Sequence, residues 1–150
     1  MSSSDFLEVT LRKSLTGLER TLSLLRNQLL ESPTISLASN GEDELHILLP
    51  LDGSRVSLER LVAELSALRD VREVRRIGTH GKVVIREIAL AQISARDDLV
   101  LSGLRILTQD ANNTVVEITG SPGDIDRILA EMRHKGVLLG AKRTGGITVG

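Results

Sequence analysis

The sequence predicts an α+β protein built from two successive βαββαβ units, the second with its first helix shortened or missing. Over residues 5–77 the apolar pattern changes in the order strand, helix, strand, strand, helix, strand. A similar order of elements returns over residues 83–150, without obvious residue identity to the first half. The composition, 41% hydrophobic and 26% charged residues, is typical of a folded globular chain.

The first unit should begin with a short strand and a helix. Residues 1–4 are expected to be disordered, and an extended segment follows at Phe6–Arg12. After a turn at Lys13–Leu15, Thr16 and Glu19 have the spacing of a capping box, which predicts the start of a helix. From there, leucines recur at helical spacing, at Leu18, Leu22, Leu25 and Leu29. Pro33 ends this region.

A hairpin, a second helix and a fourth strand complete this unit. Thr34–Ala38 is β-like, Asn40-Gly41 is a strong turn signal, and Glu44–Leu49 alternates as a strand does. Helical spacing then recurs at Leu58, Leu61, Val62, Leu65 and Leu68. Val71–Ile77 is the last strand. This order is the ferredoxin-like arrangement, in which two helices cover one face of an antiparallel sheet.

The polar segment Gly78–Lys82 predicts a linker, and residues 83–150 form the second unit. Val83–Ser94 is a long apolar strand. Ala95–Gly103 is too short and too irregular in pattern to predict a full helix. Two further strands are expected, with a turn at Asp110–Asn113 between them, at Leu104–Thr108 and Thr114–Thr119.

The segment "EITGSPGDIDRILAEM", residues 117–132, predicts a strand, a tight turn and a capped helix. Ser121 is the expected N-cap, Pro122 the first helical residue, and Gly136 the residue that ends the helix. A phosphate-binding loop is a poorer interpretation, because a Gly-x-x-x-x-Gly-Lys pattern is missing and Asp124 and Asp126 would repel phosphate. A final strand at Val137–Lys142 and a flexible end at Gly145, Gly146 and Gly150 should follow.

Charge and composition exclude several functional classes. The formal net charge is −1, and Phe6 is the single aromatic residue, so base stacking in a nucleic-acid site is not available. The chain contains no cysteine, which excludes disulfides and thiolate chemistry. No leader pattern and no apolar run of membrane-spanning length is present, so no membrane partner and a cytoplasmic location are expected.

No constellation of polar residues predicts catalysis or metal binding. His46, His80 and His134 lack metal-ligand spacing. The acidic runs Asp97-Asp98 and Glu42-Asp43-Glu44 are expected in solvated loops. A basic cluster near the domain junction is interpreted as a solvated strand edge, with contact to a partner subunit as the alternative, and consists of Arg69, Arg72, Arg75 and Arg76.

Several runs resemble the small, regulatory subunit of acetolactate synthase, a family that joins an N-terminal ACT domain to a C-terminal domain of related order. They include "VREVRRI" and "VIREIALAQI" at 71–93 and the run from residue 117 to residue 149. The family's glutamate-rich strand resembles Arg86-Glu87-Ile88, and its leucine-threonine-glycine run resembles Ile118-Thr119-Gly120. Its alanine-arginine-threonine-glycine run near the end resembles Ala141–Gly145 with one residue inserted or shifted.

The resemblance implies a non-catalytic regulatory subunit that binds and tunes a thiamine-diphosphate-dependent acetolactate synthase in branched-chain amino acid biosynthesis. It implies no cofactor in this chain, because thiamine diphosphate, Mg and FAD would belong to the catalytic subunit. It also implies a homodimer and a branched-chain amino acid as effector.

In the family that this chain resembles, the amino-acid site has an asparagine-x-x-glycine-valine-leucine turn and a second asparagine that opens the second strand. The positions that match here are Ser14, Thr16, Gly17, Leu18 and Thr34. Both asparagines are absent, and an unpaired buried polar group costs about 1–3 kcal/mol. The sequence therefore predicts weakened or lost valine feedback.

Two other functions remain open from the sequence. One is a stand-alone sensor of an amino acid or another metabolite, built on the same domain and acting without a synthase. The other is an enzyme of acylphosphatase type, which needs an anion-cradling loop with an arginine and a water-positioning asparagine. Arg12 lies near the first turn, but the rest of that pattern does not line up.

Overall fold

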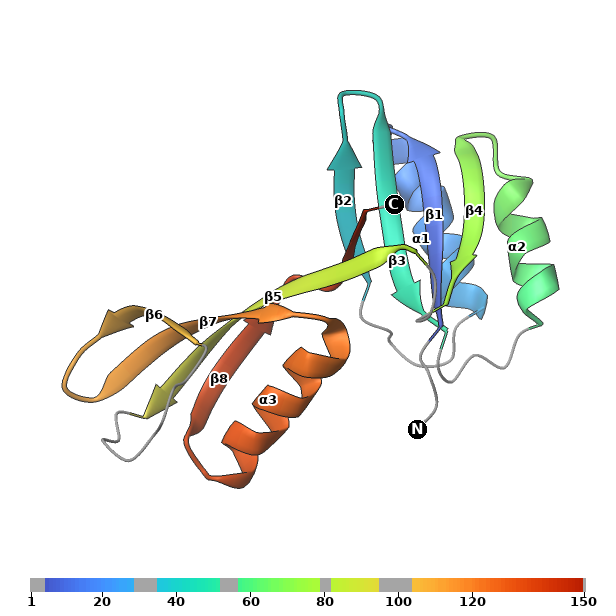
Figure 1. Cartoon of the computed structure of the whole chain (residues 1–150). Coiled ribbons are helices and arrows are strands. Elements are labelled where there is room, and N and C mark those ends of the chain that lie inside the picture. Colours follow the sequence, from blue (N-terminus) through green and yellow to red (C-terminus); the bar gives the residue numbers. More distant parts are fainter. Residues whose placement is uncertain (1–4, 29–34, 52–56, 79–81, 95–103, 150) are drawn as a thin grey trace. The chain divides into compact units, whose positions relative to one another are not determined.

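The computed structural model describes residues 5–28, 35–51, 57–78, 82–94 and 104–149 (Figure 1). The chain divides into two compact units, one ending at Val83 and the other running from Val84 to Val149. The predictions for residues 1–4, Pro33, Thr34 and the middle of the linker concern residues outside the described ranges.

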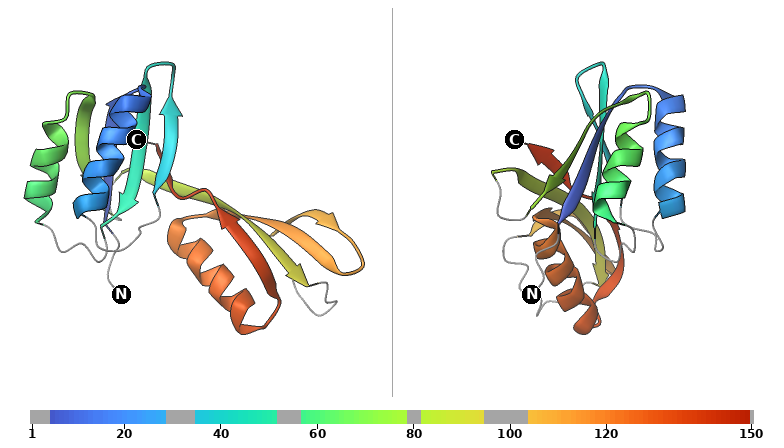
Figure 2. Two further views of the ribbon diagram at one scale, coloured as in Figure 1. Left: turned by 180° about the vertical axis from the view of Figure 1, so that it is seen from behind. Right: turned by 90° about the vertical axis from the view of Figure 1, so that its right-hand side faces the viewer.

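The first unit is a four-stranded antiparallel sheet with two helices on one face (Figure 2). Its strands are β1 (Phe6–Arg12), β2 (Ser36–Asn40), β3 (Glu44–Pro50) and β4 (Val71–Ile77), and its helices are α1 (Leu15–Gln28) and α2 (Leu58–Ser66). The order of strands across the sheet is β2-β3-β1-β4. This is the ferredoxin-like arrangement that the sequence predicts.

Alternation along β1 directs Leu7, Val9 and Leu11 toward the helices, and all three are fully buried. In the β1–β3 register, Val9 lies beside Ile47. The rest of this core comes from β3 and the apolar stripes of both helices, as Leu25, Leu49, Leu61 and Leu65. Each strand therefore contributes its period-2 face and each helix one stripe to a single core.

The start of α1 differs from the predicted capping box. Ser14 is the cap, because its Oγ accepts a hydrogen bond from the N–H of Gly17 at 3.2 Å and its carbonyl accepts one from Leu18. Thr16 lies inside the first turn instead of ahead of it. Both residue types are good caps, so the local pattern alone did not distinguish them.

The second unit consists of β5 (Val84–Ser94), β6 (Arg105–Gln109), β7 (Asn113–Gly120), α3 (Pro122–His134), β8 (Leu138–Arg143) and β9 (Ile147–Val149). Its strand order, β6-β7-β5-β8, repeats that of the first unit. The position of the shortened or missing helix falls in residues 95–103, outside the described part of the chain. The capped helix is confirmed, since Ser121 Oγ accepts from the N–H of Asp124.

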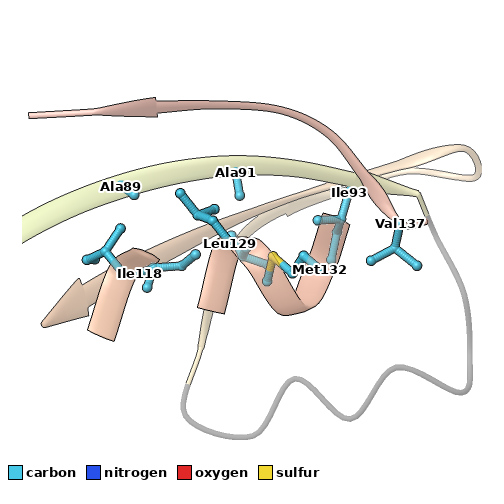
Figure 3. Packing of buried hydrophobic residues seen from close by; sticks show 9 residues of the cluster. Ala89, Ala91, Ile93, Ile118, Leu129, Met132 and Val137 are labelled. Carbon is cyan, nitrogen blue, oxygen red and sulfur yellow. The ribbon is translucent and has the colours of Figure 1, made fainter. Parts of the chain in front are cut away.

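The second core lies between α3 and one face of its sheet (Figure 3). Ala89, Ala91 and Ile93 of β5 face Leu129 and Met132 of the helix. Small alanines on the central strand let the helix approach the sheet closely. Ile118, Ile125, Val116 and Val137 complete the cluster.

The end of the chain was predicted wrongly. Gly145 and Gly146 are buried, and β9 pairs with the start of β5, where Val149 lies opposite Val84 and Ile147 opposite Arg86. The strand at Leu138–Arg143 is therefore not the last. Gly145 has φ +78°, which favours glycine at the bend between β8 and β9.

Candidate effector site

The turn from β1 into α1 holds four of the five residues that the sequence assigns to an effector. Ser14 caps the helix, Thr16 is exposed, Gly17 is buried, and Leu18 is half-buried against the core. Thr34, the fifth, lies outside the described residues. These four residues lie close together because they are near one another in the sequence at the start of α1.

The turn is tied to the neighbouring loops by backbone hydrogen bonds. The N–H of Arg12 donates to the carbonyl of Asp70 at 2.8 Å, and the N–H of Lys13 donates to that of Asp43 at 2.7 Å. Inside the helix, the Thr21 hydroxyl donates to the Gly17 carbonyl at 2.8 Å. The entry to α1 is thus held from both sides of β1.

Gly17 touches Asp70 so closely that no side chain fits between them. A Cβ at position 17 would lie 2.7 Å from the Asp70 Cβ and 2.8 Å from its Oδ2. Real Cβ atoms essentially never approach other atoms so closely. Glycine is therefore required here by the packing of α1 against the loop before β4.

An open groove of about 430 Å³ runs along the outer side of α1. Among the described residues, three leucines and three polar residues line it, namely Leu15, Leu18, Leu22, Glu19, Ser23 and Arg26. Leu15 is 85% exposed and Leu22 37%. Of the predicted effector residues, Leu18 contributes to this groove, whose lining combines apolar side chains with one acidic and one basic side chain.

The predicted basic cluster on β4 is largely neutralised within the first unit. Arg72 Nη1 lies 2.9 Å from Glu44 Oε1, and Arg75 Nε lies 2.7 Å from Oε1 of the buried Glu8. Arg76 pairs with Asp5, whereas Arg69 is exposed. Three of the four arginines are therefore paired with carboxylates of the same unit. Glu44 is a strand residue, not a loop residue.

His46 lies beside this network, on the sheet face opposite the helices. Its Nδ1 is 3.3 Å from Thr10 Oγ1, and its Nε2 is 3.5 Å from Glu44 Oε2 without hydrogen-bond geometry. His134 is exposed at the end of α3, and His80 is outside the described residues, as are Asp97 and Asp98. No group of three His, Asp or Glu side chains that could hold a metal ion occurs in the described ranges.

In the second unit, two of the runs that resemble the small-subunit family, Arg86-Glu87-Ile88 and Ala141–Gly145, come together at the buried carboxylate of Glu87. Glu87 is 2% exposed and accepts hydrogen bonds from Nε and Nη2 of Arg143, which also contacts Asp126 and the carbonyl of Pro122 on α3. The hydrogen bond to Glu87 is the main reason that the pKa of Arg143 is raised. The sequence analysis singled out the two runs that contain Glu87 and Arg143, but nothing local in the sequence indicated that these side chains pair.

Two exposed carboxylates of the second unit have lowered pKa values. The pKa of Asp110 is lowered by hydrogen bonds from the backbone N–H groups of Asn112 and Asn113. The pKa of Asp124 is lowered first by the Ser121 hydroxyl and then by Arg127. These carboxylates organise a turn and a helix start, so their perturbation has a structural cause.

The comparisons with known proteins bear on the fold. No protein-family model matches the sequence, and no significant match occurs among curated proteins. The structure is similar to the crystal structure of the acetolactate synthase small subunit from Thermotoga maritima, with a TM-score of 0.77 and 15% sequence identity. The match covers 99% of this chain and 97% of that chain, so the likeness in fold extends over both units. In the part of the chain that the structure describes, none of the helices has the length and apolar character needed to cross a membrane.

Proposed function

We propose that this chain is a non-catalytic regulatory subunit that binds an acetolactate synthase catalytic subunit and tunes its activity. The observation that carries the proposal is the likeness to an acetolactate synthase small subunit over 99% of the chain. A single ferredoxin-like unit supports many unrelated functions. Agreement over two successive units is a more demanding match, and the resemblance of residues 117–149 points the same way.

Regulation would work through differential binding. A subunit that binds the active state of its partner more tightly than the inactive state shifts the partner toward activity. The chemistry, with thiamine diphosphate, Mg and FAD, would remain in the catalytic subunit. The residues of this chain would contribute contacts that differ between the two states.

The effector part of the proposal concerns the β1–α1 turn. A branched-chain amino acid would bind there to Ser14, Thr16, Gly17 and Leu18, together with Thr34. The Ser14 oxygen already accepts the N–H of Gly17, which reduces what it can offer to a ligand. We therefore expect weak valine binding or none.

A homodimer belongs to the same proposal. The exposed Leu15 and Leu22 on α1 would be removed from water if the groove faced a second copy. Sedimentation of the purified chain tests this, and a species of monomer mass at micromolar concentration contradicts it.

The deciding experiment is acetolactate formation from pyruvate by the catalytic subunit of the same organism, measured with and without this chain and then with valine. We expect a rise on mixing that valine leaves largely unchanged. A rise that valine reverses would establish feedback despite the altered turn. No rise and no co-elution would instead favour a stand-alone metabolite sensor.

Calorimetry separates the effector from activation. The chain is titrated with valine, leucine and isoleucine in turn. Absence of heat for all three removes the effector site and leaves activation in place, because linkage requires binding but activation by the subunit does not.

A further inference from the structure

The central strand of the second unit has one buried and one exposed apolar face. Ala89, Ala91 and Ile93 alternate toward α3 and are at most 1% exposed. Ile88 and Leu90, which precede Ala89 and Ala91 in the strand, lie on the opposite face and are 42% and 44% exposed. A one-sided antiparallel sheet usually presents polar residues to water on its open face.

The exposed face continues along β5 into its pairing with β9. Positions 84, 86, 88 and 90 alternate to the same side, and the register adds Val149 beside Val84 and Ile147 beside Arg86. Val84, Ile147 and Val149 are 55%, 46% and 75% exposed. We call the five side chains the β5 stripe: Val84, Ile88, Leu90, Ile147 and Val149.

Positive charge borders the β5 stripe. Lys142 on β8 and Glu117 on β7 lie on either side of Leu90, and Arg105 on β6 is the cross-strand partner of Glu117. Arg86 stands within the stripe itself. Among the residues that the structure describes, three cations therefore share this face with one carboxylate, although the whole chain has a net charge of −1.

We propose that the β5 stripe is the surface through which this chain docks onto its catalytic subunit, against an apolar patch bordered by carboxylates. The inference rests on the proposed function and identifies the surface used. Apolar side chains at the centre of an interface with charges at its rim are the usual arrangement of protein–protein contacts. Pairing of this face with its own copy would bring two net positive surfaces together, which disfavours a second copy as the occupant.

The test compares matched variants in binding of the full-length chain to the purified catalytic subunit. Leu90→Glu places a carboxylate at the centre of the stripe, and Lys142→Glu reverses a charge at its border. Ile106→Glu is the control for the first, because Ile106 is 47% exposed but pairs with Val116 on the α3 side of the same sheet. Arg133→Glu on α3 is the control for the second, since Arg133 is also exposed.

We expect the two stripe variants to weaken binding at least about tenfold and the two controls to weaken it less than about threefold. The association rate of the unmodified chain should also fall as the salt concentration is raised. Unchanged binding by Leu90→Glu and Lys142→Glu, while the unmodified chain binds, overturns the docking surface and leaves the proposed function intact. Failure of the unmodified chain to bind overturns the proposed function instead. Loss of a homodimer in Leu90→Glu would assign the stripe to a second copy and overturn the inference.

Discussion

Gly17 is the residue for which a single methyl group should matter most. Gly17→Ala would force a Cβ to within 2.7 Å of the Asp70 Cβ, so α1 or the loop before β4 must move. We expect a loss of about 1–3 kcal/mol in the free energy of unfolding, the usual cost of overpacking. Urea unfolding followed by circular dichroism measures it.

Gly123 provides the matched control, because it also lies in the first turn of a helix but has open space where a Cβ would lie, with no neighbouring atom within 4 Å. Gly123→Ala should be neutral or stabilise by up to about 1 kcal/mol, since alanine has the higher helix propensity. Equal effects of the two substitutions would show that the contact with Asp70 does not restrict residue 17.

Asp110 should make stability depend on acid. Its Oδ1 accepts from the N–H groups of Asn112 and Asn113, each at 2.8 Å, so its pKa is lower in the folded state than in the unfolded chain. The resulting stabilisation is fully present above the unfolded pKa of about 4 and is lost as pH falls through the folded pKa. Asp110→Asn retains an acceptor oxygen without the charge.

The pH dependence of unfolding below about pH 4 should therefore be shallower in Asp110→Asn than in the unmodified chain. Chemical unfolding at several pH values, with the Asp110 carboxyl titrated by NMR, provides the measurement. A folded-state pKa equal to that of an unstructured aspartate would contradict this account of the turn.

The element that depends most on one side chain is β8, because Arg143 joins it to β5 and to α3. Replacing Arg143 by Ala leaves Glu87 buried without its partner, which should cost about 2–4 kcal/mol, allowing for the 30% exposure of the arginine side chain. Amide exchange of β5 and β8 under native conditions reports the loss. Lys142→Ala, one residue earlier and exposed, is the control and should cost less than about 0.5 kcal/mol.

A second replacement distinguishes a buried pair from simple packing. Glu87→Gln combined with Arg143→Met removes both charges and retains comparable volume, and such exchanges are often close to neutral. If the double variant is no more stable than Arg143→Ala, the loss comes from the arginine's contacts with α3 and not from the stranded carboxylate.

Comparison of the elements shows which features a sequence can predict. β1 and β4 match the predicted Phe6–Arg12 and Val71–Ile77 because their alternation is local. β9 was missed because three residues after a glycine-rich bend carry little periodic signal, and its partner Val84 lies far away in the sequence. The Glu87–Arg143 pair, 56 residues apart, was missed for the same reason.

At the candidate site, too, local features could be predicted from the sequence and contacts between distant residues could not. Local signals predicted a turn between β1 and α1. The effector residues assigned to that turn came from the family resemblance and stay a prediction. The sequence pattern placed the cap at Thr16 instead of Ser14 because both residue types are good caps. The contact between Gly17 and Asp70 joins residues far apart in the sequence, so no local pattern indicated it. The groove along α1 depends on how much of Leu15 and Leu22 the rest of the unit leaves exposed, which no local pattern states.

At the scale of the whole molecule, the two units have separate hydrophobic cores. Among the described residues, the buried cluster of the first unit runs from Leu7 to Leu65, and that of the second runs from Ala89 to Val137. The boundary between the units falls between Val83 and Val84. Since stability is set largely by the core that a residue belongs to, damage to one core should remain within its own unit.

Reciprocal core substitutions test this independence. Ile125→Ala should cost about 2–5 kcal/mol and accelerate amide exchange in β5, β7 and β8, because Ile125 is fully buried beneath that sheet. Leu61→Ala, equally buried in the first unit, should do the same in β1 and β3. In each variant the amide exchange of the unsubstituted unit should stay within about twofold of that in the unmodified chain.

If both units lose protection together in either variant, the chain unfolds as one cooperative body, and a signal received at the β1–α1 turn could reach the β5 stripe through stability alone. If they unfold separately, such a signal cannot be carried by a shared unfolding equilibrium.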